Sequence, residues 1–212
     1  GALRVSAKVT FEGVDHELIM ISAYFVPGQP GLVYLTGRAD AGVSVSLLTN
    51  SLEATDVPAV HGGYAPYRKA LLEHGVKLYE LRRQPGDGGG SGPHVFYSKS
   101  FRGSDSSLHS KAMIFDRQKS FIGSFNFDPR SVLWNTEVGV LVDSPELAEH
   151  VRELALQGMA PALSYQAKLQ DGQIVWVTED NGQMHTLTKE PGSWWRRFNA
   201  WFSTTVGLER ML

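Results

Sequence analysis

The sequence predicts an α/β fold: a mixed, largely parallel sheet flanked by helices, then a small C-terminal β-meander and a terminal amphipathic helix. Between residues 17 and 80, short apolar runs typical of buried strands alternate with helical segments, the pattern of parallel strands joined through helices. Residues 165–187 alternate instead around two turn signals, Asp171-Gly172 and Asn181-Gly182, and indicate an antiparallel meander. With 212 residues and 42% hydrophobic content, the chain can build one such core with a small extension.

The first half of the chain contains three expected strands. Residues 17–26 form an apolar run that ends at Pro27-Gly28, which predicts a buried strand with a loop at its carboxyl end. The segment 57–74 carries apolar and aromatic residues at helical spacing, and Gly75 is expected to end this helix. The remaining elements are a helix over 31–41 and strands over 43–49 and 76–80.

The second half begins with a segment that is unsuited to regular structure. Residues 85–93 read PGDGGGSGP and are expected to form a flexible loop. A phosphate-binding loop is disfavoured there, because no strand leads directly in and no Gly-Lys-Ser/Thr follows. Strand-like runs come next at 108–115, 120–126 and 136–142, followed by a helix over 145–158 with Pro145 at its start. We expect one domain over residues 1–163 and a C-terminal part over 164–212.

Composition excludes several classes of protein. The chain carries 20 basic and 22 acidic residues, so it lacks the strong basic field of a non-specific nucleic-acid binder, although a local basic patch is compatible with these numbers. It has no cysteine, which excludes disulfides, zinc–thiolate sites and a thiol nucleophile. The sequence contains no run of about 18 apolar residues, the length that would predict a bilayer span. The chain starts with Gly-Ala and shows no signal-peptide pattern, as expected of a processed or excised piece of a longer protein.

One set of polar residues has a specific spacing. Residues 109–126 read HSKAMIFDRQKSFIGSFN, which fits H-x-K-x4-D-x6-G-S-x-N at every fixed position. His109 and Lys111 are two residues apart, so on a single strand both side chains would point to the same face. An imidazole and an ammonium could then meet one phosphate, the ammonium neutralising oxygens whose charge grows in the transition state. The histidine would attack phosphorus or transfer a proton.

The rest of the motif is expected to support this phosphate site. Ser124 and Asn126 would donate hydrogen bonds to phosphate oxygens, and Gly123 would let the backbone come close to a ligand. Asp116 belongs to the motif, but it falls just beyond the strand, and we expect it to fix a turn or hold a neighbouring charge. Glu137, on the next expected strand, could accept a hydrogen bond from one nitrogen of His109 and leave the other free. The alternative for Glu137 is an ordinary surface charge.

This motif resembles the signature of the phospholipase D superfamily. Three further segments, at residues 22–28, 43–81 and 126–148, are similar to the second half of bacterial cardiolipin synthases, closest to their C-type branch, and the similarity covers most of residues 15–160. The resemblance implies phosphatidyl transfer between phospholipids through a phosphohistidine, without a metal or other cofactor. It also implies a role for Glu137, because an acidic residue on the strand after the motif orients the histidine in this superfamily.

The superfamily's active site resembles two facing copies of the motif, one histidine attacking phosphorus and the other protonating the leaving alcohol. This chain has one copy: no other histidine is followed two residues later by lysine. Either two chains pair as a homodimer, or an upstream half supplies the first motif, and the resemblance favours the second arrangement. The absent first motif leaves open whether the chain is active alone.

The resemblance also points to substrate-binding candidates near the carboxyl ends of the first two strands, where open α/β sheets bind ligands. They are Tyr24, Phe25 and Pro27 at the first edge, Asn50 and Ser51 at the second, and His61, Tyr64 and Arg68 on the following helix. For the helix residues the alternative is a polar face that packs over the sheet.

The last 20 residues, 193–212, form an aromatic and basic candidate helix. Its tryptophans and arginines suit the headgroup zone of a bilayer, and the alternative is packing against the domain. The resemblance to cardiolipin synthases implies phosphatidylglycerol and phosphatidylethanolamine as partners, on a bacterial membrane surface to which the protein binds peripherally. No nucleic acid is expected. Two other functions stay open: a hydrolytic phospholipase or nuclease of the same superfamily, and a non-catalytic lipid-binding or dimerising half.

Overall fold

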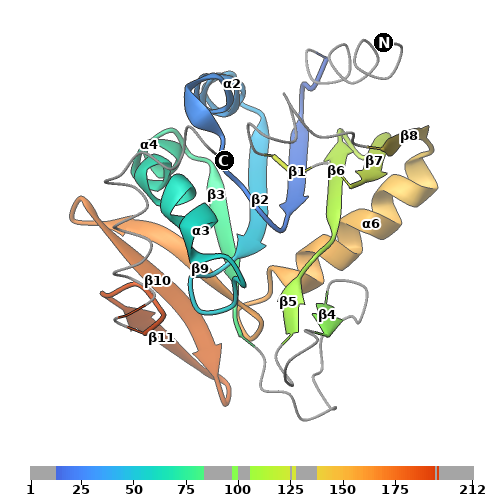
Figure 1. Cartoon of the computed structure of the whole chain (residues 1–212). Coiled ribbons are helices and arrows are strands. Elements are labelled where there is room, and N and C mark those ends of the chain that lie inside the picture. Colours follow the sequence, from blue (N-terminus) through green and yellow to red (C-terminus); the bar gives the residue numbers. More distant parts are fainter. Residues whose placement is uncertain are drawn as a thin grey trace.

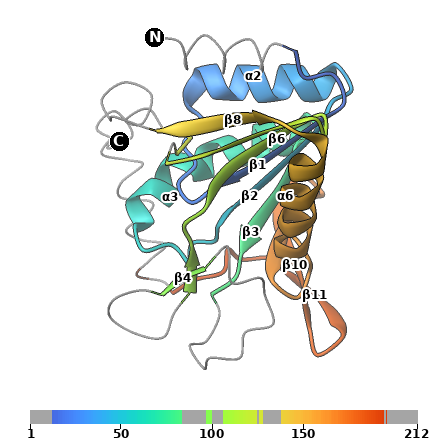
Figure 2. The same ribbon diagram turned by 90° about the vertical axis from the view of Figure 1, so that its right-hand side faces the viewer.

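The computed structural model describes residues 13–83, 97–99, 106–124, 126–127, 138–193 and 195, with only the backbone at 97–99 and 106–107. In this part of the chain, nine strands form one sheet in the order β11-β10-β9-β3-β2-β1-β6-β7-β8 (Figure 1). Helices lie on both of its faces (Figure 2). The predicted α/β class is confirmed.

The described elements have the following bounds. The strands of the large sheet are β1 Glu17–Ser22, β2 Ser44–Asn50, β3 Lys77–Leu81, β6 Lys111–Phe115, β7 Lys119–Gly123, β8 Gly139–Asp143, β9 Ser164–Gln170, β10 Gln173–Asp180 and β11 Gln183–Leu187. A separate two-stranded sheet contains β4 Tyr97–Lys99 and β5 Ser106–Leu108. The helices are α2 Gly28–Asp40, α3 Pro58–Tyr64, the 3-10 helix η1 Ala65–Tyr67, α4 Arg68–Glu73 and α6 Pro145–Gly158.

The sheet is mixed, as predicted, but mostly antiparallel rather than largely parallel. Only the pairs β1–β2 and β2–β3 are parallel among the described strands. The other six neighbouring pairs are antiparallel. Helices connect the first three strands, and α6 joins β8 to β9 at opposite parts of the sheet. Short turns connect β6 to β7 and β9 through β11, and a tight turn can join only antiparallel neighbours.

Alternate residues of the central strands feed two hydrophobic cores. On β1, Leu18 and Met20 belong to the core beneath α2, α3 and α4, while Ile19 and Ile21 belong to the core beneath α6. Burial on both faces explains why this strand reads as a continuous apolar run. The predicted helix over 145–158 is confirmed at both ends, and the Ser144 hydroxyl caps it by accepting from Leu147 N at 3.3 Å.

The predicted helix over 57–74 is present as three successive short helices, α3, η1 and α4. The predicted meander is also confirmed, and its four turn residues, Asp171, Gly172, Asn181 and Gly182, all have positive φ angles, as its two tight hairpin turns require. Because β9 pairs with β3, the meander extends the main sheet. The division at residue 163 stays a prediction.

Three strand ends define the edge that matters for function. The parallel strands β1, β2 and β3 end at Ser22, Asn50 and Leu81, and we call this side of the sheet the carboxyl edge. Lys111, the first residue of β6, pairs with Ser22 and therefore lies at this edge. None of the helices in the described ranges has the length and apolar character needed to cross a membrane.

Candidate active site

His109 and Lys111 lie at the carboxyl edge, but not on one continuous strand. The predicted strand over 108–115 is interrupted: β5 ends at Leu108, β6 begins at Lys111, and His109 and Ser110 lie between them. Strand alternation therefore cannot fix the direction of the His109 side chain, and that part of the prediction was wrong. The two motif residues are linked differently, because Lys111 Nζ donates to the His109 carbonyl at 2.8 Å, and the His109 residue is exposed.

The interruption is held by a side chain from another strand. Asn50, at the end of β2, is 2% exposed. Its amide nitrogen donates to the Leu108 carbonyl at 3.1 Å and to the Ala23 carbonyl at 3.2 Å. Its amide oxygen accepts from Leu108 N at 2.9 Å. Both backbone groups of the residue before His109 are thus bound by Asn50.

A second buried side chain holds the other end of the motif. Ser22, at the end of β1, is 1% exposed; its hydroxyl donates to the Tyr24 carbonyl at 2.6 Å and accepts from Phe127 N at 3.2 Å. Phe127 also forms a parallel bridge with Phe25 and stacks on its ring at 5.4 Å between centroids. These contacts bring Asn126, the residue before Phe127, to the carboxyl edge.

The Gly-Ser-x-Asn segment is used partly for structure. A Cβ on Gly123 would lie 2.5 Å from the Val138 carbonyl oxygen, so the pairing of β7 with β8 requires a glycine here. The close approach of a ligand to the Gly123 backbone stays a prediction. The Ser124 hydroxyl accepts from Val138 N at 3.1 Å and lies 3.3 Å from its carbonyl. Asn126 Oδ1 is buried with no hydrogen-bond partner in the described part of the chain. An amide oxygen can only accept, so the donation to a phosphate oxygen would have to come from Nδ2 of Asn126 and stays a prediction.

Asp116 lies at the opposite end of β6 from His109, roughly 20 Å away along an extended chain. Its carboxylate accepts hydrogen bonds from the backbone N–H groups of Asp15, His16 and Glu17 at 2.9, 2.7 and 2.8 Å. Burial acts to raise the pKa of Asp116, but these three donors favour the charged form and the net pKa is lowered. This geometry supports the structural interpretation and gives Asp116 no contact with the carboxyl edge.

Glu137 lies outside the described residues, so its orienting role stays a prediction. Most of the terminal aromatic segment, 193–212, and the loop over 85–93 also lie outside them. Trp195 is described and is 54% exposed.

The substrate-binding candidates on the two strand ends have partners within the protein. The Tyr24 hydroxyl donates to Asp56 Oδ1 at 2.7 Å, and burial, with this carboxylate beside it, raises the pKa of Tyr24. Ser51 is fully buried and its hydroxyl accepts from Ala54 N at 3.2 Å. Asn50 is used as described above. Direct substrate contact stays a prediction for these residues.

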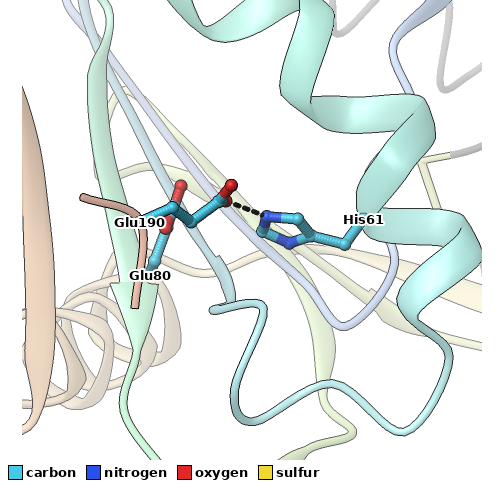
Figure 3. A group of neighbouring side chains, drawn as sticks. All are labelled: His61, Glu80 and Glu190. Atoms are coloured by element: carbon cyan, nitrogen blue, oxygen red, sulfur yellow. Dashed lines mark hydrogen bonds and ion pairs between the residues drawn. The ribbon is translucent and has the colours of Figure 1, made fainter. Parts of the chain in front are cut away.

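His61, Tyr64 and Arg68 are buried over the sheet, which fits the alternative of a polar helix face packed on it. His61 and Arg68 meet Glu80 from β3 and Glu190, which follows β11, and we call these four residues the charge cluster. Figure 3 shows three of them, His61, Glu80 and Glu190. Glu190 Oε1 lies 2.6 Å from His61 Nε2 and 2.6 Å from Arg68. Arg68 also contacts Glu80 Oε1 at 3.1 Å.

A metal does not fit the charge cluster, although ligand atoms of His61, Glu80 and Glu190 all lie within 4.8 Å of one another. The Arg68 guanidinium already bonds both carboxylates, and Trp176 Nε1 donates to the other oxygen of Glu80 at 2.9 Å. A cation would have to displace these donors. The cluster is therefore an internal ion-pair network.

Sequence reasoning missed Ser22, Glu80 and Glu190. A polar residue that closes an apolar run, as Ser22 does, and a lone acid in an apolar strand, as Glu80 is, were the available signals. Glu190 had no local signal, because its partner His61 lies 129 residues away.

Comparison with known proteins identifies the family of this chain. Residues 12–157 match the family model described as "Cardiolipin synthase, PLD-like domain". The chain belongs to this family.

Curated relatives agree with this membership in the cardiolipin synthase family. The chain is 40% identical to cardiolipin synthase C of Escherichia coli K12 over 196 residues, which are 91% of this chain and 40% of that protein. It is 29% identical to cardiolipin synthase B of Salmonella typhi over 143 residues, or 68% of this chain and 29% of that protein. The chain thus spans two-fifths or less of the length of these relatives.

Solved structures show the same fold at low identity. The phospholipase D family member Nuc from Salmonella typhimurium has a TM-score of 0.53 at 19% identity, covering 72% of this chain and 84% of that one. Phosphatidylserine synthase from Haemophilus influenzae has a TM-score of 0.55 at 16% identity, covering 74% of this chain and 35% of that one. The phospholipase D-like fold predicted from the motif is confirmed.

Proposed function

We propose that this chain supplies one of the two catalytic motifs of an enzyme that transfers a phosphatidyl group between phospholipids and thereby forms cardiolipin. The observation that carries the proposal is the placement of a complete H-x-K…G-S-x-N set, in a cardiolipin synthase-family domain, at the carboxyl edge. His109 and Lys111 come from the start of β6, and the Asn126 segment is tied to the end of β1.

The proposed reaction has two steps, and both histidines act in each of them. A ring nitrogen of His109, or of its counterpart, attacks the phosphorus of the donor lipid, forming a P–N bond while the P–O bond to the donor's headgroup alcohol breaks. The second histidine gives its proton to that alcohol. It then takes a proton from the hydroxyl of a phosphatidylglycerol acceptor, whose oxygen attacks phosphorus and breaks the P–N bond.

Lys111 and Asn126 act on charge and position in this proposal. The Lys111 ammonium neutralises non-bridging phosphate oxygens as their charge grows, and the Asn126 amide donates to another oxygen. The reaction exchanges one phosphodiester for another without a change of oxidation state, and histidine catalysis needs no metal, so we propose that no cofactor takes part.

The second motif comes from an upstream half or from a second copy of the chain. The chain spans 40% of its Escherichia coli relative, which leaves room in a protein of that length for another half. We propose the upstream half as the partner and a bacterial membrane surface, bound peripherally, as the place of reaction. The exposed Trp195 agrees with contact at a lipid headgroup layer.

Lipid product analysis tests the proposal. This chain and a longer form that carries the upstream half are each given phosphatidylglycerol with phosphatidylethanolamine in mixed micelles. Cardiolipin from the longer form alone supports the half-site; cardiolipin from the isolated chain shows that two copies complete a site. Release of free headgroup with phosphatidic acid, or cleavage of a nucleotide diester without transfer, would show that the enzyme is a hydrolase and not a cardiolipin synthase.

Matched variants test the residues. In the active form, His109→Ala should abolish turnover with an unchanged thermal midpoint, while His185→Ala, on the distant exposed strand β11, should leave the rate unchanged. Lys111→Ala should cost about 3–4 kcal/mol of transition-state stabilisation, by analogy with loss of an oxyanion donor. Lys119→Ala, at the other end of the neighbouring strand β7, is its control. Wild-type turnover in His109→Ala would refute the catalytic assignment.

A further inference from the structure

We infer that Asn50 and Ser22 form a buried brace that positions the two parts of the motif: Asn50 positions His109, and Ser22 positions Asn126. The inference rests on the proposed function, because it assigns these residues to the same site. Neither belongs to the H-x-K motif, and both would act through the backbone of a neighbouring residue rather than by touching substrate.

Asn50 replaces a strand partner at the break between β5 and β6. In an antiparallel pair, two facing residues exchange N–H···O bonds in both directions. Asn50 makes the same exchange with Leu108 through its side-chain amide, accepting at 2.9 Å and donating at 3.1 Å. The backbone that leads into His109 therefore follows the amide plane of Asn50, which is itself tied to the Ala23 carbonyl at 3.2 Å.

Ser22 makes the corresponding link on the other side. Its hydroxyl accepts from Phe127 N at 3.2 Å and donates to the Tyr24 carbonyl at 2.6 Å. Val26 N also donates to the Phe127 carbonyl at 2.7 Å, so the segment that follows Asn126 is held along the residues after β1. The two links end on adjacent carbonyls, those of Ala23 and Tyr24.

The turn after β1, to which both links are tied, sets the distance between the two parts of the motif. The turn after β1 bonds Asn50 through Ala23 and Ser22 through Tyr24, while Lys111 pairs directly with Ser22 in the sheet. A shift of one link therefore moves His109 relative to Asn126. Misplacement of a reacting group by about 1 Å can cost on the order of 100-fold in rate.

The same contacts argue against substrate binding by Asn50. Both of its N–H donors have backbone carbonyl partners, and the residue is 2% exposed. Removal of a substrate contact would raise KM. Removal of a positioning residue should lower kcat and leave KM nearly unchanged, because the lipid still binds where it did.

The test uses the active, full-length form of the protein and phosphatidylglycerol in mixed micelles. Asn50→Asp keeps the size and the acceptor but loses both donors, and Ser22→Ala removes one hydroxyl. Each should lower kcat on the order of 10- to 100-fold with KM within about threefold of wild type. The control is Thr178→Val on β10, which loses a buried hydroxyl bond of 2.8 Å to the Pro161 carbonyl and should keep its kcat.

The outcomes separate the brace from the proposed function. If His109→Ala in the same assay is inactive while both brace variants keep wild-type kcat, the brace is refuted and the proposed function stands. If His109→Ala is as fast as wild type, the proposed function itself fails. A large rise in KM at unchanged kcat would make Asn50 a substrate contact. If Asn50→Asp does not fold, Ser22→Ala decides, since it deletes one atom from a serine on a well-packed strand.

Discussion

The charge cluster predicts how this protein responds to loss of one carboxylate. Glu190 Oε1 is held by His61 and Arg68, each at 2.6 Å, and joins the segment after β11 to α3 and α4. Burial acts to raise the pKa of Glu190, but the hydrogen bond from His61 and the charge of Arg68 outweigh it and lower the pKa to about 2. Glu190→Gln removes the charge while keeping the side chain's size and one acceptor.

The size of the effect follows from the difference between folded and unfolded states. A fall in pKa from 4.5 to about 2 corresponds to roughly 3 kcal/mol of folding stability. Because the folded-state pKa of Glu190 is the lower one, this stability is fully present above pH 4.5 and is lost as the pH falls towards 2. Glutamine resembles the protonated acid, so Glu190→Gln should cost about 3 kcal/mol near pH 7 and almost nothing near pH 2.

Urea denaturation at pH 7, 4 and 2 measures this difference in free energy of unfolding. The control is Glu73→Gln, because Glu73 pairs with Lys69 at 3.9 Å and both side chains are more than half exposed. Exposed pairs of this kind contribute under about 1 kcal/mol. The reasoning is refuted if Glu190→Gln costs no more than the control at pH 7, or if its cost is undiminished at pH 2.

Two further predictions concern the motif. Gly123→Ala should destabilise the protein by about 1–3 kcal/mol in a thermal unfolding assay, because the new Cβ would lie 2.5 Å from the Val138 carbonyl oxygen and weaken the pairing of β7 with β8. The control is Gly37→Ala in helix α2, where a new Cβ would meet nothing within 4 Å. It should stabilise the protein by roughly 0.5–1 kcal/mol in the same assay. Asp116→Ala should destabilise the protein by about 1–3 kcal/mol, since it removes the charged acceptor of three backbone N–H groups. At a temperature where the variant is folded, its kcat should equal that of the wild type. An Asp116→Ala variant that is inactive but as stable as the wild type would instead show that Asp116 takes part in catalysis.

Much of the fold could be predicted because its signals are local. The apolar runs of β1 and β2, Pro145 at the start of α6 and the Asn-Gly and Asp-Gly turns of the meander each depend on a few adjacent residues. The sheet is less parallel than predicted, although the antiparallel meander was predicted, because the antiparallel pairings of β9 with β3 and of β6 with β1 join segments far apart in the chain. Apolar periodicity carries no information on which partner a strand selects.

The candidate site was predictable where it depends on spacing and not where it depends on tertiary partners. The motif gave His109, Lys111 and Asn126 by their positions alone. The interruption at His109 was missed because the group that replaces the strand pairing comes from Asn50, 58 residues earlier. A run such as LHSKAMIF reads as one strand unless that distant amide is known.

These buried links bear on how far the motif alone predicts activity. His109 is exposed between β5 and β6, and Asn50 binds both backbone groups of Leu108, the residue before it. Asn126 depends in the same way on Ser22 through Phe127. A related chain that keeps H-x-K and G-S-x-N but replaces both buried partners by apolar residues would retain the chemical groups and lose the geometry that lets them meet one phosphate. Such chains should bind lipid and turn over slowly, so among chains that keep the motif we expect the residues that end β1 and β2 to separate fast enzymes from slow ones.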